Sequence, residues 1–297
     1  MWIADSWGES FSLLDCGNGE KLEKWGPYCL VRPDPQAIWT PEGKDVGWKR
    51  YDARYNRSNT GGGAWENRTL PQDAVQNGWS VRYRDLTFLV RPMSFKHTGI
   101  FPEQAVNWDF VAERTKKRLA SGKSMRILNL FAYTGAATAA ALAAGAEVCH
   151  VDAARGMVAW ARENAAASGV ADRVVRWIVD DCAAFIEREI RRGRFYDGII
   201  LDPPSYGRGP TGQVWKMETN LYPFVKLCER ALSDDPDFVL MSAYTAGLNP
   251  GVAGYVLGDA IGRRRGGSVA YDELGLACRA TGLNLPCGSS ARWTAAV

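Results

Sequence analysis

The sequence predicts an α/β protein in which a doubly wound, mostly parallel sheet follows a small β-rich N-terminal domain. From residue 126 onward, apolar runs of strand length alternate with longer amphipathic segments, which is the pattern of successive βαβ units. Before residue 110, eight of the twelve tryptophans lie among short apolar runs separated by turns. We therefore expect two domains, residues 1–95 and residues 96–297.

The first domain is expected to consist of short strands and hairpins. Turn signals such as Gly17-Asn18-Gly19 and Gly26-Pro27 interrupt its apolar pattern. The strand-like runs are residues 11–15, 28–32 and 80–91. Convincing helical periodicity first occurs at residues 108–119, where basic residues gather toward the end, as the helix dipole favours.

The second domain continues with strands and helices in alternation. The predicted elements are strand 126–131, helix 136–144, strand 147–152, helix 154–168, strand 174–181, helix 183–192, strand 195–202, helix 218–232 and strand 238–244. A helix opened by Pro250, at the permissive first position, precedes a closing strand pair at 268–271 and 291–295. Right-handed crossovers between the parallel strands place helices on both faces of the sheet.

Charge and cysteine content limit the classes of function. A net charge of +3 on 297 residues permits an anionic partner without requiring one. The seven cysteines are scattered without a Cys-x-x-Cys pair, and the only histidines are His97 and His150, so no metal site is indicated. No apolar run reaches about 18 residues, and the N-terminus lacks the pattern of an export signal. We expect a cytoplasmic protein without metal or membrane association, and the oligomeric state stays open.

The ends of the first three strands carry residues suited to a cofactor. The first strand runs into the small-residue turn Asn129–Gly135, which lets a ligand approach the backbone and the start of the next helix. Asp152 ends the second strand, where a carboxylate can accept hydrogen bonds from both ribose hydroxyls. Asp180 and Asp181 end the third strand, where a carboxylate can accept from an adenine amino group. Asp181 can alternatively serve only as the cap of the following helix.

The glycine content of the first turn separates two classes of cofactor. A nicotinamide dehydrogenase would carry Gly-x-Gly-x-x-Gly there, but Gly135 is the only glycine in the turn, so a pyrophosphate would lack its cradle. A ligand with ribose and adenine but no phosphate fits better. S-adenosyl-L-methionine is the common cofactor of that description.

The fourth strand ends in Asp202-Pro203-Pro204-Ser205-Tyr206, directly after the apolar run 198–201. The prolines cannot extend the sheet, and ligands of open α/β sheets bind beyond the carboxyl ends of the strands. The Asp202 carboxylate or the Pro203 carbonyl can accept hydrogen bonds from a substrate amino group, while Tyr206 can stack on a flat ring. The alternative is a polar strand-to-loop turn with a packing tyrosine.

In combination, these motifs resemble the class I S-adenosylmethionine-dependent methyltransferases, and within them the bacterial large-subunit ribosomal RNA group that methylates cytosine or guanine. The resemblance runs from Ser94 to the C-terminus and implies a Rossmann-like, seven-stranded methyltransferase sheet with a C-terminal antiparallel strand. Lys96–Gln104 is similar to a segment that borders the cofactor pocket in this group, although Ala105 replaces its usual arginine. We expect no PUA domain ahead of the β-rich one.

The resemblance implies two sets of site residues. The cofactor-binding set is Thr98, Phe101, Gln104, Asn129, Phe131, Ala132, Tyr133, Thr134, Gly135, Asp152, Ala153, Asp180, Asp181, Cys182 and Asp202. The catalytic set is Asp202, Pro203, Pro204 and Tyr206.

The fifth strand bears on the methylated atom. A cytosine carbon-5 methyltransferase needs a cysteine nucleophile, and the cysteine-bearing member of the group carries Ser-Cys-Ser after this strand. This chain has Met241-Ser242-Ala243-Tyr244 there, while Cys182 and Cys228 lie in apolar contexts. We therefore expect methyl transfer to a nitrogen of an RNA base by direct in-line displacement. The alternatives are a methyltransferase of a protein glutamine or small planar molecule, and a non-catalytic RNA-binding protein of the same fold.

Overall fold

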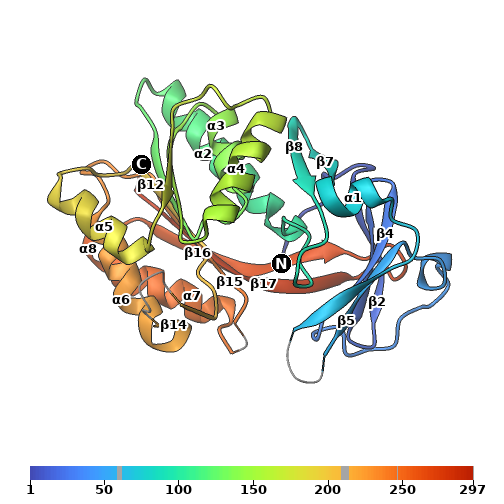
Figure 1. The fold of residues 1–297 in the computed structure, drawn as a ribbon. Helices are drawn as coiled ribbons and strands as arrows, with labels where there is room; N and C mark the ends of the chain where they lie inside the picture. The colour runs from blue at the N-terminus through green and yellow to red at the C-terminus, as the bar shows by residue number, and fades with distance from the viewer. Residues whose placement is uncertain (59–61, 209–213, 246, 297) are drawn as a thin grey trace. The chain divides into compact units, whose positions relative to one another are not determined.

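The computed structural model describes residues 1–58, 62–208, 214–245 and 247–296 (Figure 1). The chain forms two compact units. Unit 1 comprises Met1–Val106 and Leu274–Cys287, and unit 2 comprises Asn107–Glu273 and Gly288–Val297. Residues 96–106, which we expected in the catalytic domain, thus belong to unit 1.

Unit 1 is β-rich, as the sequence predicted. Its five-stranded sheet has the order β2 (Phe11–Gly17), β3 (Glu20–Trp25), β4 (Tyr28–Pro33), β5 (Ala53–Arg57) and β6 (Gly63–Asn67). A separate hairpin joins β7 (Trp79–Tyr83) and β8 (Leu86–Val90). Its short helices are η1 (Val46–Trp48), α1 (Gln72–Asn77) and η2 (Pro102–Gln104). Asn18 and Gly19 both have positive φ between β2 and β3, which gives the tight turn that a two-residue hairpin requires.

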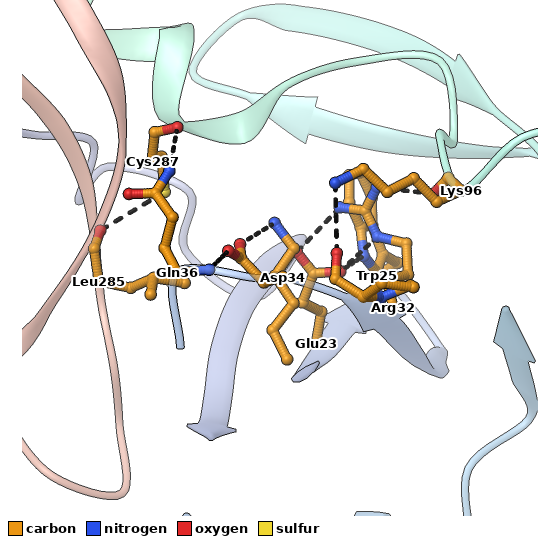
Figure 2. Close-up of polar contacts among 10 residues, drawn as sticks. Glu23, Trp25, Arg32, Asp34, Gln36, Lys96, Leu285 and Cys287 are labelled. Carbon is orange, nitrogen blue, oxygen red and sulfur yellow. Dashed lines mark hydrogen bonds and ion pairs between the residues drawn. The ribbon is translucent and has the colours of Figure 1, made fainter. Parts of the chain in front are cut away.

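A buried cluster of charged side chains lies on β3 and β4 of unit 1 (Figure 2). Glu23 is fully buried, and its carboxylate accepts hydrogen bonds from Arg32 Nε at 2.6 Å and Arg32 Nη2 at 2.9 Å. Lys21 Nζ lies 3.4 Å from Glu23 Oε1 and 3.5 Å from Asp34 Oδ2. Trp25 Nε1 also donates to Glu23, at 3.2 Å. Because each buried charge has an opposite charge beside it, the cost of desolvation is offset within the cluster.

Unit 2 contains most of the doubly wound sheet, whereas residues 2–3, 274–277 and 284–287 of its strands belong to unit 1. The eight strands of this sheet, among the described residues, have the order β1-β16-β17-β15-β12-β9-β10-β11. Their bounds are β1 (Trp2–Ile3), β9 (Arg126–Leu130), β10 (Glu147–Asp152), β11 (Val175–Val179), β12 (Gly198–Leu201), β15 (Phe238–Ala243), β16 (Ser268–Ala277) and β17 (Asn284–Thr294). The strands β9 to β12 and β15 are parallel, and β17 is antiparallel to β15. The predicted seven-stranded sheet is therefore present, and β1 pairs with Leu274 and Gly275 as an addition that the sequence pattern did not reveal.

Helices cover both faces of this sheet. The helices are α2 (Ala105–Ala120), α3 (Ala136–Ala143), α4 (Arg155–Ala167), α5 (Cys182–Arg191), α6 (Met217–Arg230), α7 (Pro250–Leu257), the π-helical turn η3 (Gly258–Gly262) and α8 (Arg263–Arg265). Figure 1 shows α3 and α4 on one face and α5, α6 and α7 on the other. On the second face, buried strand residues such as Leu130, Leu201 and Met241 share one core with Phe185 and Phe224 of the helices.

The strand order reverses at β9, which is flanked by β10 on one side and β12 on the other. In doubly wound sheets, ligands bind beside such a reversal, at the carboxyl ends of the strands. After β12, a hairpin of β13 (Tyr206–Arg208) and β14 (Val214–Lys216) was not expected from the sequence. It returns the chain to the start of α6.

Candidate active site

Strand register brings three of the predicted motifs to one edge of the sheet. Leu130, the last residue of β9, pairs with Leu201 of β12 and with Val151 of β10. The residues that follow, Phe131, Asp202 and Asp152, therefore leave three adjacent strands at the same level. Since parallel strands share one carboxyl edge, the turn after β9 and the Asp-Pro-Pro motif after β12 face a common site.

The turn after β9 has a strained backbone. Phe131 and Tyr133 have φ of 53° and 51°, in the left-handed region that side-chain-bearing residues rarely adopt, and Gly135 has φ of 79°. A Cβ on Gly135 would lie 2.7 Å from Ala161 Cβ, so only glycine fits this position. Gly135 is also the N-cap of α3, and the first backbone N–H groups of this helix point toward the site. Strain of this kind is typical of ligand sites.

Asp152 holds that turn in place from the end of β10. Its Oδ2 accepts a hydrogen bond from Tyr133 N at 2.9 Å, and its Oδ1 accepts from Ala154 N at 2.8 Å. Burial raises the pKa of Asp152 above its ordinary value, an effect that the two backbone N–H groups partly oppose. Each carboxylate oxygen has a second lone pair, so the group can still receive ribose hydroxyls. Ala153 next to it is exposed.

Asn129 and Cys182 support the turn from below. Asn129 is buried and donates to Thr138 Oγ1 at 2.9 Å, and Thr138 Oγ1 is 3.0 Å from His150 Nδ1. His150 Nε2 is buried without a hydrogen-bond partner among the described residues. The Cys182 sulfur accepts a hydrogen bond from Phe131 N at 3.4 Å. Burial raises the pKa of the Cys182 thiol well above its ordinary value.

The remaining residues of the turn are largely enclosed. Ala132 and Thr134 are buried, and Asn164 of α4 donates to the Thr134 carbonyl at 2.8 Å. Ala132 N donates to Val151 O at 3.1 Å, which continues the ladder between β9 and β10 for one residue.

The acidic pair after β11 is already engaged within unit 2. Asp181 is the N-cap of α5, where its Oδ1 accepts from Ala184 N at 2.9 Å. Asp180 forms an ion pair with Arg188 of the same helix. The capping role considered for Asp181 is therefore present, and Arg188 is a partner of Asp180 that sequence reasoning missed.

The Asp-Pro-Pro motif forms a loop fixed by three segments. Trp215 Nε1 donates to Pro204 O at 2.6 Å, Met217 N donates to Ser205 O at 3.1 Å, and Thr245 Oγ1 donates to Ser205 Oγ at 2.7 Å. Asp202 is half-buried and Pro203 buried, whereas 54% of Tyr206 is exposed. The tyrosine ring is thus not a packing residue of the core. Trp215 was missed by sequence reasoning, although an isolated tryptophan so soon after the motif was a usable signal.

Thr98, Phe101 and Gln104 belong to unit 1. Thr98 is fully buried, and its Oγ1 has no hydrogen-bond partner among the described residues. Phe101 packs edge-on against His97 with ring centroids 5.1 Å apart, and Gln104 is buried. Burial lowers the pKa of His97 to about 4, and Arg32 and Lys96 add to the effect.

Across the described residues, no cluster of three or more acidic, histidine or cysteine side chains could hold a metal ion. No helix in the described part of the chain is long and apolar enough to cross a bilayer.

The comparisons with known proteins show that this chain is an enzyme that uses S-adenosylmethionine as methyl donor. The family model for S-adenosylmethionine-dependent methyltransferases matches residues 68–219, and the chain belongs to this family. A crystal structure of the SAM-dependent methyltransferase from Agrobacterium tumefaciens is 36% identical, with a TM-score of 0.89, and the match covers 98% of this chain and 93% of that one.

More distant comparisons agree on the fold and the class. A putative SAM-dependent methyltransferase from Streptococcus mutans has the same fold, with a TM-score of 0.68 at 18% identity, over 97% of this chain and 76% of that one. Ribosomal RNA large subunit methyltransferase K/L of Shewanella sp. (strain MR-4) is 31% identical over 121 residues, which are 40% of this chain and 16% of that protein. The protein of that name from Chromohalobacter salexigens is 32% identical over 136 residues, 46% of this chain and 17% of its own length. The chain therefore spans less than a fifth of these curated relatives.

Proposed function

We propose that the enzyme methylates a base of ribosomal RNA, at a ring or exocyclic nitrogen, by direct in-line displacement. The observation that carries the proposal is the position of Asp202–Tyr206, one strand away from the turn that follows β9 and in register with it. The ribosomal RNA large subunit methyltransferases of Shewanella and Chromohalobacter, which are 31% and 32% identical over 40% and 46% of this chain, support the choice of acceptor.

The cofactor site would be built on the strained turn. We assign the ribose hydroxyls to Asp152 and the adenine amino group to Asp180 or Asp181. The backbone of Phe131–Gly135 and Ala153 would lie directly against the cofactor. The left-handed backbone at Phe131 and Tyr133 fits a ligand that lies against main-chain atoms, whereas the missing Cβ of Gly135 makes room for Ala161. Asn129 and Cys182 would support the turn from its buried side, and a cofactor role for Thr98, Phe101 and Gln104 stays a prediction. When bound, S-adenosylmethionine supplies an electrophilic methyl group on a sulfonium.

The residues after β12 would hold the acceptor. The Asp202 carboxylate and the Pro203 carbonyl accept hydrogen bonds from an amino group, which directs the nitrogen lone pair toward the methyl carbon. As the new N–C bond forms, the S–C bond breaks with its electron pair on sulfur, and the proton lost from nitrogen passes to Asp202 or water. Exposed Tyr206 stacks on the extruded base.

The state of Cys182 and Cys228 supports nitrogen over carbon as the acceptor. Carbon-5 of cytosine must first be attacked by a thiolate. Burial raises the pKa of both Cys182 and Cys228, which keeps these thiols protonated and poorly nucleophilic. Ser242, in the segment compared above with the Ser-Cys-Ser motif of the cysteine-bearing member of the group, is buried in β15.

The test is mass mapping of ribosomal RNA from cells that lack the gene. One base is expected to lose its methyl group, to regain it with the wild-type gene, and to stay unmethylated with Asp202→Ala. Asp234→Ala changes an exposed acid after α6, is the matched control and should restore methylation.

If every site keeps its methyl group, the RNA proposal is wrong. Transfer of tritium from labelled S-adenosylmethionine to protein or small molecules would then favour the alternative acceptors. A protein that binds S-adenosylmethionine but transfers to nothing would favour a non-catalytic RNA-binding role.

RNA is accordingly the proposed partner, and the cytoplasm is the proposed location.

A further inference from the structure

Trp215 lies between the two halves of the candidate site. Its indole N–H donates to the Pro204 carbonyl at 2.6 Å. Its ring packs against Phe131 with centroids 5.2 Å apart and planes tilted by 56°. One side chain thus contacts both the Asp-Pro-Pro loop and the strained turn after β9.

A small aromatic cluster fixes the indole in this position. Phe224 of α6 packs edge-on against Trp215 at 5.4 Å and also lies 5.4 Å from Phe131. All three rings rest on the buried core between the sheet and α5, α6 and α7. Three mutually packed rings leave few rotamers, so the N–H is held in line with the carbonyl it contacts. Gly207 pairs with Trp215 across the β13–β14 hairpin, which ties the tryptophan backbone to the same loop.

The other two contacts of the loop reach a different residue, because Met217 N and Thr245 Oγ1 both donate to Ser205.

We infer that Trp215 is a positioning residue that couples the cofactor turn to the substrate motif, so that binding at the turn orders Asp202–Tyr206. The inference rests on the proposed role of Asp202–Tyr206 in holding the acceptor. In-line transfer depends on alignment at the scale of an ångström or less, so loosening this link should slow transfer more than it weakens cofactor binding.

Hydrogen exchange measured with and without S-adenosylhomocysteine tests the coupling without any knowledge of the acceptor. In the wild type, the ligand should slow amide exchange in peptides covering residues 131–137 and 205–208. In Trp215→Phe, which removes the N–H, protection should persist at 131–137 and fall by about tenfold at 205–208. Equal protection of 205–208 in both proteins would overturn the inference.

A second replacement separates the hydrogen bond from ring packing. Benzothienylalanine at position 215 keeps a bicyclic ring and has no N–H, so it should behave as Trp215→Phe does even if the smaller phenyl ring destabilises the protein. Trp293→Phe is the matched control. Trp293 Nε1 donates to Gly266 O at 2.7 Å, and Trp293 pairs with Val239 near the amino end of β15, away from the carboxyl edge. This control should melt at a lower temperature and keep the protection at 205–208.

Turnover gives an independent measurement. With ribosomal RNA from cells that lack the gene, Trp215→Phe should lower kcat by about tenfold or more and change the KM for S-adenosylmethionine by less than about twofold. An unchanged kcat would contradict the inference. If the wild type transfers no methyl group to this RNA, the proposed acceptor is wrong, and the exchange experiment still decides the role of Trp215.

Discussion

The carboxylate of Asp152 accepts a hydrogen bond from the backbone N–H of Tyr133 at 2.9 Å, which joins the end of β10 to the turn after β9. Tyr133 has a positive φ, so the bond stabilises a backbone conformation that would otherwise be unfavourable. The residue expected to receive the ribose therefore also shapes the turn against which the cofactor would lie. These two roles predict that changes at Asp152 affect binding through more than one contact.

We expect Asp152→Asn to weaken S-adenosylhomocysteine binding by about 1–3 kcal/mol, because the amide group can accept from only one of the two N–H groups that the carboxylate now satisfies. Calorimetry measures the affinity directly. Asp234→Asn makes the same chemical change at an exposed site and should bind normally. An affinity for Asp152→Asn equal to that of the control would remove Asp152 from the cofactor site.

A second prediction concerns Gly135 and uses Gly169 for comparison. Both glycines have a positive φ, of 79° and 70°, but only at Gly135 would a Cβ clash, with Ala161 Cβ at 2.7 Å. Gly169→Ala should lower the free energy of unfolding by about 1–2 kcal/mol, the cost of a left-handed alanine. Gly135→Ala should cost about 1–3 kcal/mol more because of overpacking. Urea unfolding gives both values, and equal losses in the two variants would contradict the steric argument.

Most of the doubly wound sheet could be predicted from the sequence because its strands are buried and apolar. Residues 147–152 were predicted as a strand and form β10 with the same bounds, and the helix predicted at 136–144 is α3, Ala136–Ala143. In such βαβ units, local hydrophobic periodicity and the order of elements together determine which edge carries the ligand. That is why the strand-end motifs could be placed on one edge before the structure was known.

The missed features depend on partners far away in the chain. Strand β1 pairs with residues 274 and 275, a partner that no local pattern identifies. The strand predicted at 268–271 extends to Ala277, past the polar residues of its middle, because β-propensity is decided by pairing as much as by residue type. In the site, the contact of Trp215 with Phe131 joins residues 84 positions apart and becomes visible only in three dimensions.

For Cys182, the expected role is structural. Its sulfur accepts from Phe131 N at 3.4 Å, and its buried thiol has a raised pKa. Cys182→Ser keeps an acceptor and should retain both S-adenosylhomocysteine affinity and methyl transfer, whereas Cys182→Ala leaves the N–H unsatisfied and should weaken affinity by about tenfold. Complete loss of transfer in the serine variant, with binding intact, would instead indicate a cysteine nucleophile.

Tyr206 should contribute to acceptor binding through its ring. Because 54% of its surface is exposed, replacement should cost little stability. Tyr206→Ala should raise the KM for RNA by an amount equivalent to about 1–3 kcal/mol of lost stacking, and Tyr206→Phe should keep it near the wild-type value. Steady-state kinetics at saturating S-adenosylmethionine measure both. A large defect in the phenylalanine variant would show that the hydroxyl, rather than the ring, matters.

The buried cluster of unit 1 gives a prediction about pH (Figure 2). Burial alone would raise the pKa of Glu23, but Arg32 and Lys21 outweigh it and lower the pKa from 4.5 to about 2. The folded state therefore favours the ionised carboxylate, and this contribution to stability is complete above pH 4.5 and is lost as the pH falls toward about 2.

At pH 7, Glu23→Gln leaves buried cations without their shared partner and should lower the free energy of unfolding by about 3–5 kcal/mol. The difference between wild type and variant should shrink as the pH falls below 4.5, which urea unfolding at a series of pH values measures. Glu66→Gln removes the exposed partner of Arg68 and should change stability little at any pH. A Glu23→Gln difference that stays constant down to about pH 2 would mean that the lost stability comes from packing and not from the charge.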